Sequence, residues 1–217
     1  VSGKAPAVVG ASFVAPSANL TGAVHLGQGA SVWYSSMLKG DVSAVEIGEL
    51  SSVGDRAIVT ASTVGRGVNI GAGALVTSAK VGDNCSVGMG AKVLKGASLG
   101  TGSMLAAGSV LPAGTFVPSG QLWAGNPAKW VGEVGADQLQ GLESTAALTA
   151  ELASLHAAEA WKDYALVEEE AGDYKRQMHR TPDYISYLRE DPKWVPMPTL
   201  GEYLTKIGAH SQKFTPP

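Results

Sequence analysis

The sequence predicts a mainly β protein: a parallel β-solenoid of six-residue repeats, followed by a long C-terminal α-helix and an extended tail. Three observations predict it. Apolar residues recur every six positions through residues 8–117, glycine is concentrated in the same region, and charge is concentrated after it. Neither a helix, with a period of about 3.6, nor a simple strand, with a period of about 2, keeps a strict period of six.

The apolar period predicts about six coils, each with three faces of six residues. The residue two places before each periodic position is nearly always small, and both point inward because side chains alternate along a strand. One large and one small inward residue per face suit a narrow triangular coil. The periodic residues are Val8, Val14, Leu20, Leu26, Val32, Leu38, Ile47, Val53, Val59, Val64, Ile70, Val76, Val81, Val87, Val93, Leu99, Leu105, Leu111 and Val117.

The departures from the period are local. The step from Leu38 to Ile47 is nine residues, which predicts about three extra residues bulging out near residues 39–42. The steps 59–64 and 76–81 are five residues, which we interpret as one-residue deletions at corners. Residues 120–130 leave the period and are expected to turn the chain.

Composition places an architectural boundary near residue 132. Of the 28 glycines, 22 lie before residue 126, whereas only 13 of the 35 charged residues lie in the first 132 positions. We therefore expect a solenoid at 1–132, an amphipathic helix at 133–171 packed on it, and a proline- and aromatic-containing tail at 172–217. Within 137–171, which is rich in Ala, Leu and Glu, we expect one helix along the solenoid wall, with leucines 148, 152 and 155 at helical spacing.

Charge and cysteine content exclude several classes. The formal net charge is −3 with no basic run, so nucleic-acid binding has little support. No apolar run approaches the 18 residues or so of a membrane span, so we expect a protein peripheral to a membrane at most. One cysteine excludes an internal disulfide, and Cys85 occupies a small inward position where burial is expected.

Three motifs together resemble the γ-class carbonic anhydrases: KGDV at 39–42, VGMGA at 87–91 and LWAGNPAK at 122–129. The resemblance extends from residue 8 to about residue 165. It implies a left-handed parallel β-helix, a trimer, and sites at the subunit interfaces. There, two histidines of one subunit and one of its neighbour bind a zinc ion, which polarises a water that attacks carbon dioxide.

The chain departs from this family at the positions that matter most. The three zinc-ligand histidines fall on Thr60, Ala72 and Thr77. Alanine offers no donor atom and a threonine hydroxyl is a poor zinc ligand, so we expect no metal, cofactor or catalytic residue in this chain. No two of its own histidines have the spacing of metal ligands. In an assembly with related subunits, zinc remains possible at an interface between two partners.

Charged positions of the family are better retained. Asp41 and Asp55 keep the family carboxylates, and Lys39 replaces an arginine, which keeps the charge but loses the bidentate fork. The resemblance implies that Lys39, Asp41 and Asp55 pair across a subunit interface. The alternative is that they are solvated surface charges.

Three functions remain open at this point. The resemblance favours a catalytically inactive subunit with a structural role in a heterotrimer of γ-carbonic-anhydrase-type subunits. In that family such trimers sit on the matrix side of the membrane arm of mitochondrial respiratory complex I, at the inner membrane. The second is a homotrimer with a small-molecule or regulatory binding role. The third is an enzyme, either a γ-class carbonic anhydrase with altered ligands or a hexapeptide acyltransferase.

Overall fold

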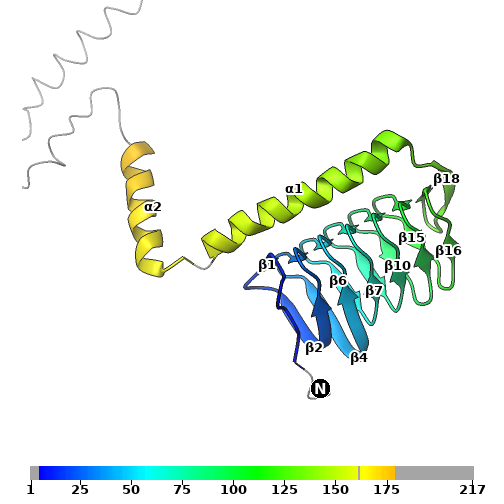
Figure 1. The fold of residues 1–217 in the computed structure, drawn as a ribbon, viewed down its shortest axis with the longest axis horizontal. Coiled ribbons are helices and arrows are strands. Elements are labelled where there is room, and N and C mark those ends of the chain that lie inside the picture. Colours follow the sequence, from blue (N-terminus) through cyan, green and yellow to red (C-terminus); the bar gives the residue numbers. More distant parts are fainter. Residues whose placement is uncertain (1–4, 161, 179–217) are drawn as a thin grey trace, which may run out of the picture. The chain divides into compact units, whose positions relative to one another are not determined.

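The solenoid has three faces, each formed by short strands from successive coils (Figure 1). The computed structural model describes residues 5–160 and 162–178. The first face contains β1 (Phe13–Val14), β3 (Ser31–Val32), β5 (Ser52–Val53), β8 (Asn69–Ile70), β11 (Ser86–Val87), β14 (Met104–Leu105) and β17 (Gln121–Ala124). These strands pair in parallel and in register, so equivalent residues of successive coils form columns.

The second and third faces share one sheet because β2 (Asn19–Leu26) and β4 (Met37–Ile47) run across both. The second face continues with β6 (Ile58–Thr60), β9 (Leu75–Thr77), β12 (Lys92–Val93) and β15 (Val110–Leu111). The third face continues with β7 (Thr63–Val64), β10 (Lys80–Val81), β13 (Ser98–Leu99) and β16 (Phe116–Val117). The architecture is the predicted parallel β-solenoid of about six coils.

The periodic residues form the core. The first-face column Val32, Val53, Ile70, Val87 and Leu105 is at most 2% exposed. Most of the small inward residues are buried beside them, and the buried hydroxyls of the described residues have hydrogen-bond partners. Ser51 Oγ, for example, donates to the Gly65 carbonyl at 2.7 Å. Val8 departs from the pattern, because it is 42% exposed.

Cys85 takes one of the small inward positions, as expected. Its Sγ lies 2.9 Å from the Gly100 carbonyl oxygen and 3.5 Å from Ser103 Oγ. Burial raises the pKa of the thiol, because the thiolate would be desolvated. The cysteine is therefore a packing residue with a suppressed thiolate fraction.

The predicted bulge is present in β4. Gly22 pairs with Gly40 and Val24 with Val45, so one residue of β2 faces four residues of β4. The three extra residues project from the wall, and Val42 is 93% exposed. At the other end, β18 (Lys129–Glu133) pairs antiparallel with β17, which closes the last coil with a hairpin.

The C-terminal helical region differs from the prediction. A single helix over 137–171 was expected, but α1 (Ala136–Ala160) ends early and α2 (Tyr164–Met178) begins after a break. The chain divides between Lys162 and Asp163 into two compact units. Helix α2 also continues past residue 172, where the tail was expected to begin, and the tail residues 179–217 lie outside the described residues.

Helix α1 packs along the first face of the solenoid (Figure 1). Ala146, which is 6% exposed, and Ala153, which is fully buried, make the central contact. The half-buried Leu139 lies close to Gly102 nearer the start of the helix. The row expected on this amphipathic helix points elsewhere: Leu148, Leu152 and Leu155 are 65%, 47% and 60% exposed.

An aromatic cluster anchors the C-terminal half of α1 to the first coils. His156 lies with its ring 5.0 Å from Trp33 and 5.9 Å from Phe13, centroid to centroid. A hydrogen bond of 3.0 Å joins Tyr34 Oη and His156 Nδ1. This is the polar contact that fixes the rotation of α1 at this end.

Replacing Gly48 with alanine tests the tight stacking at the corners. A Cβ at this position would overlap the backbone carbonyl of Gly65 in the next coil, so both coils would have to separate. We expect Gly48→Ala to lower the free energy of unfolding by about 1–3 kcal/mol, measured by urea denaturation. Gly141→Ala is the control, because Gly141 is helical and has open space around it; this change should stabilise by about 0.5–1 kcal/mol. Equal stability of the two variants would contradict the stacking argument.

Replacing Tyr34 with phenylalanine tests the anchor of α1. The change removes the hydrogen bond to His156 and keeps the ring contacts, so we expect a loss of about 0.5–1 kcal/mol. Hydrogen exchange should rise in the C-terminal half of α1 more than in the solenoid strands. Tyr164→Phe is the control, since its hydroxyl bonds Glu168 on the exposed surface of α2. Unchanged protection of α1 in Tyr34→Phe would show that the bond does not hold the helix.

Candidate functional site

Two of the three expected ligand positions stack directly on each other. Thr60 ends β6 and Thr77 ends β9, and the two are register partners on the second face. Lys39 of β4 pairs with Thr60 in the same column, one coil earlier. Both threonines are half-buried and Lys39 is exposed. A column of one ammonium and two hydroxyls therefore lines the far edge of the second face.

Ala72 lies at a different corner. It follows β8, at the corner between the first and second faces, whereas Thr77 is at the far end of β9. Two backbone hydrogen bonds link this corner to the coils on either side. The Gly73 N–H donates to the Asp55 carbonyl at 2.7 Å, and the Gly90 N–H donates to the Ala72 carbonyl at 2.9 Å. Within one chain, the width of the second face thus separates Ala72 from the two threonines.

This separation has a consequence for any shared site. Side chains at positions 60 and 77 can act together, but position 72 can join them only if the corner of a second chain meets the edge of the second face. The donor set at these positions is two hydroxyls and a methyl group. That set does not fit zinc, which takes imidazole, thiolate or carboxylate ligands, so no chemical step through a metal follows from it.

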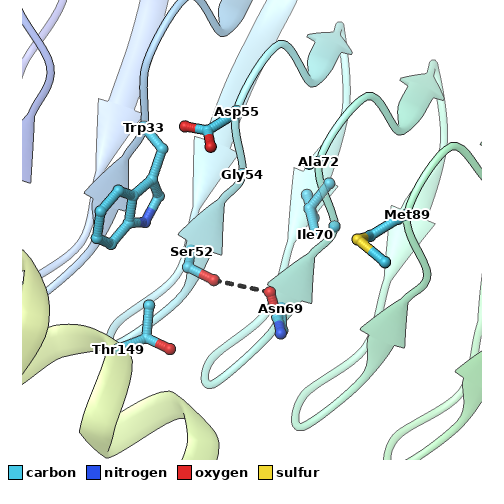
Figure 2. Close-up of a pocket in the computed structure, with 10 residues that line it drawn as sticks. Trp33, Ser52, Gly54, Asp55, Asn69, Ile70, Ala72, Met89 and Thr149 are labelled. Atoms are coloured by element: carbon cyan, nitrogen blue, oxygen red, sulfur yellow. Dashed lines mark hydrogen bonds between the residues drawn. The ribbon is translucent and has the colours of Figure 1, made fainter.

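Ala72 lines an open groove between the first face and α1 (Figure 2). Its volume is about 260 Å³. The lining residues are Trp33, Ser52, Gly54, Asp55, Asn69, Ile70, Gly71, Ala72, Met89 and Thr149. Figure 2 shows Asp55, Ala72 and Met89 on successive coils along one rim, with Thr149 entering from α1 on the other side.

The polar atoms of the groove are hydrogen-bonded to neighbouring groups. Ser52 Oγ donates to Asn69 Oδ1 at 3.0 Å, and the Thr149 hydroxyl donates to the Thr145 carbonyl within α1. Asp55 accepts the backbone N–H of Tyr34 at 3.0 Å. No imidazole, thiol or ammonium lines the groove, and the Ser52 hydroxyl is hydrogen-bonded to Asn69 and not to Asp55. Its chemistry is that of a shallow, mostly apolar binding surface.

The predicted interface charges are exposed and are not brought together in one chain. Lys39 and Asp41 lie at the bulge of β4, where Thr21 Oγ1 approaches Asp41 at 3.4 Å. Asp55 lies on the groove rim, at the other edge of the second face. None of the three forms an ion pair with another residue in the described part of the chain.

The histidines of the described residues are also dispersed. His25 is exposed on β2, and His156 belongs to the aromatic cluster under α1. In residues 5–160 and 162–178, no three His, Cys, Asp or Glu side chains are grouped to hold a metal ion. Neither α1 nor α2, the two helices described, has the length and hydropathy that crossing a bilayer requires.

Sequence reasoning missed the contribution of α1 to the groove. Thr149 belongs to α1, and the sequence pattern does not indicate which coil of the solenoid lies beside it. Met89 could have been found, because the VGMGA motif places it one coil after Ala72 in the same column. Trp33 could also have been found, because it follows Val32 as Gly54 follows Val53, one coil later.

Comparison with known proteins agrees with the six-residue repeats. The family model for the bacterial transferase hexapeptide, six repeats, matches residues 78–113. Among solved structures, a hexapeptide transferase family protein from Anaplasma phagocytophilum is 35% identical with a TM-score of 0.60, over 65% of this chain and 90% of that one. A putative acetyltransferase of Bacillus cereus is 26% identical with a TM-score of 0.62, over 67% of this chain and 91% of that one.

Longer matches come from plant proteins. Gamma carbonic anhydrase 1, mitochondrial, of Arabidopsis thaliana is 34% identical over 209 residues, which are 90% of this chain and 76% of the relative. Gamma carbonic anhydrase 2, mitochondrial, of the same plant is also 34% identical over 209 residues, with 75% of its length covered. Since this identity extends through the solenoid and beyond it, the chain belongs to the γ-class carbonic anhydrase family.

Proposed function

We propose that this chain is a catalytically inactive γ-carbonic-anhydrase-like subunit with a structural role in a heterotrimer. The observation that carries the proposal is the donor set at positions 60, 72 and 77, where hydroxyls and a methyl group stand on an otherwise regular solenoid. Loss of every nitrogen donor removes the metal's own ligands, which surrounding residues cannot replace. A solenoid that keeps its regular fold but lacks metal ligands is suited to a structural role in an assembly.

The second face supplies a surface for that assembly. Met37, Ile58 and Leu75 are register partners in one outward column, and the first two are 36% and 38% exposed. Apolar residues in a row on a flat sheet are typical of a contact surface. The column lies between the edge that carries Thr60 and Thr77 and the corner that carries Ala72. A neighbouring subunit packed on this column would lie beside both edges of the second face.

In such a trimer, the donor set of this chain also limits where a zinc site can form. Each site draws on two adjacent subunits, so a subunit without donors disables the two interfaces it shares. A zinc site remains possible at the third, between two partners that keep their histidines. Lys39, Asp41 and Asp55 would then pair across the interfaces of this subunit, which accounts for carboxylates and an ammonium left without ion pairs in the described chain.

The location follows from the relatives and from the family resemblance. Both Arabidopsis relatives are named as mitochondrial proteins, which supports a mitochondrial location. The resemblance supports the matrix side of the inner membrane, on the membrane arm of respiratory complex I. In this arrangement the chain touches membrane-arm subunits and needs no span of its own.

Zinc content tests the loss of the metal site. We expect the purified chain to hold far less than one zinc ion per chain by elemental analysis, because none of the three positions supplies a nitrogen or sulfur donor. Changing Thr60, Ala72 and Thr77 together to histidine should raise zinc in any assembly in which two such chains meet. A control triple, Thr63→His, Thr101→His and Ala113→His, puts the same residues at scattered exposed positions and should not. Stoichiometric zinc in the unchanged chain, or carbon dioxide hydration by it, would overturn the proposal.

Charge placed on the second face tests the assembly. Co-expressed with a histidine-bearing γ-type subunit, the chain should form mixed trimers by native mass spectrometry. Ile58→Asp should reduce them about ten-fold or more, because it buries a carboxylate in an apolar contact. Phe116→Asp is the matched control, an exposed apolar residue on the third face that should leave trimers intact. A pure homotrimer in mitochondrial extracts, separate from complex I on native gels, would favour the alternative of a homotrimer with a binding role.

A further inference from the structure

Helix α1 has two apolar faces, and the solenoid uses one of them. The face toward the solenoid includes Ala146 and Ala153, which are buried. Leu148 and Leu155 each follow one of these alanines by two residues, a rotation of about 200° around the helix. They therefore point away from the solenoid, and Leu152 lies between them. We call Leu148, Leu152 and Leu155 the leucine stripe.

The leucine stripe has the spacing of a helix-pairing seam. Its steps of four and three residues are those of the apolar positions of a heptad. The three side chains are 65%, 47% and 60% exposed. One exposed leucine on a protein surface is ordinary, but three in one row along a helix form an apolar ridge that another helix can cover.

The charges of α1 restrict what can cover it. Between residues 136 and 160 the helix has four acidic side chains and no lysine or arginine. Two of the acids have partners: Glu143 accepts from Asn84 Nδ2 at 3.1 Å, and Glu159 pairs with Lys162 at 2.8 Å. Glu151 lies between Leu148 and Leu152 in sequence and borders the stripe, and it is exposed. The stripe is thus an apolar ridge with an acidic border.

This border disfavours two of the possible occupants. Pairing the stripe with the same stripe of a second copy would place two helices side by side that have four acids each and no lysine or arginine between residues 136 and 160. An anionic membrane surface would repel the helix for the same reason. A helix with an apolar row flanked by lysine or arginine satisfies both the ridge and the charge.

We propose that the leucine stripe of α1 is a docking surface for a basic amphipathic helix of a partner protein. The surface points away from the solenoid, so it is separate from the second face and from the groove. The proposal does not rest on the trimer or on the loss of zinc. It gives α1 a second role beside covering the first face.

The test uses the full-length chain and a synthetic helical probe. The probe is a labelled peptide of about 21 residues, with leucine at heptad positions a and d and lysine at e and g, followed by fluorescence anisotropy. A second peptide has glutamate in place of lysine, and a third has serine in place of leucine. We expect the lysine peptide to bind and the other two to bind at least about ten-fold more weakly.

Variants of the chain locate the binding. Changing Leu148, Leu152 and Leu155 to glutamine keeps the helix propensity high and should lower the affinity for the lysine peptide about ten-fold or more. The matched control changes Ala147, Ser154 and Ala158, exposed residues outside the stripe, to glutamine and should leave binding unchanged. Glu151→Lys should lower the affinity for the lysine peptide and raise the affinity for the glutamate peptide. This reversal depends on charge, which a merely structural role of α1 would not produce.

Several results would overturn the proposal. It fails if the lysine peptide does not bind, or if binding survives the triple leucine change. It also fails if the stripe variant instead loses co-sedimentation with phosphatidylserine-containing vesicles, which would make it a membrane surface. If the change lowers the oligomeric state of the chain itself and the peptide does not bind, the stripe is a contact between copies. Circular dichroism of every variant checks that α1 is still folded.

Discussion

The register between successive coils is the constraint on which this structure depends. The strands of the three faces pair in parallel with their equivalents one coil away, so backbone hydrogen bonds align equivalent residues of successive coils in columns. An inward column must be apolar along its whole length, and a corner column must leave room for the next backbone. A misfit at one position, such as a side chain at Gly48, therefore affects two coils together.

The same register distributes the polar residues. It aligns Lys39, Thr60 and Thr77 along one edge of the second face and puts Ala72 at the opposite corner. A solenoid of this kind cannot bring the two edges of one face together by bending, because the columns are held by backbone hydrogen bonds. Chemistry that needs all three positions must be built between chains. The residue types at positions 60, 72 and 77 then determine the chemistry that is possible between the chains.

The packing of helix α1 divides its apolar residues between two faces. Ala146 and Ala153 are buried against the first face, while Leu148, Leu152 and Leu155 face outward. Tyr34 and His156 then fix the rotation through one hydrogen bond within an aromatic cluster. The result is a helix that covers the solenoid with one face and offers a second apolar face, bordered by acids, to another protein.

The solenoid, its number of coils and the three-residue bulge of β4 could be predicted from the sequence, because a six-residue period leaves one way to stack. The columns that hold residues 60, 72 and 77 follow from the same period, whereas the chemistry expected there came from family resemblance. The break between α1 and α2 and the rotation of α1 could not be predicted. Alanine and leucine rows both have helical spacing, so the pattern predicts an amphipathic helix without deciding which row is buried. Only the packing of the folded chain decides that, and with it the place of Thr149 in the groove.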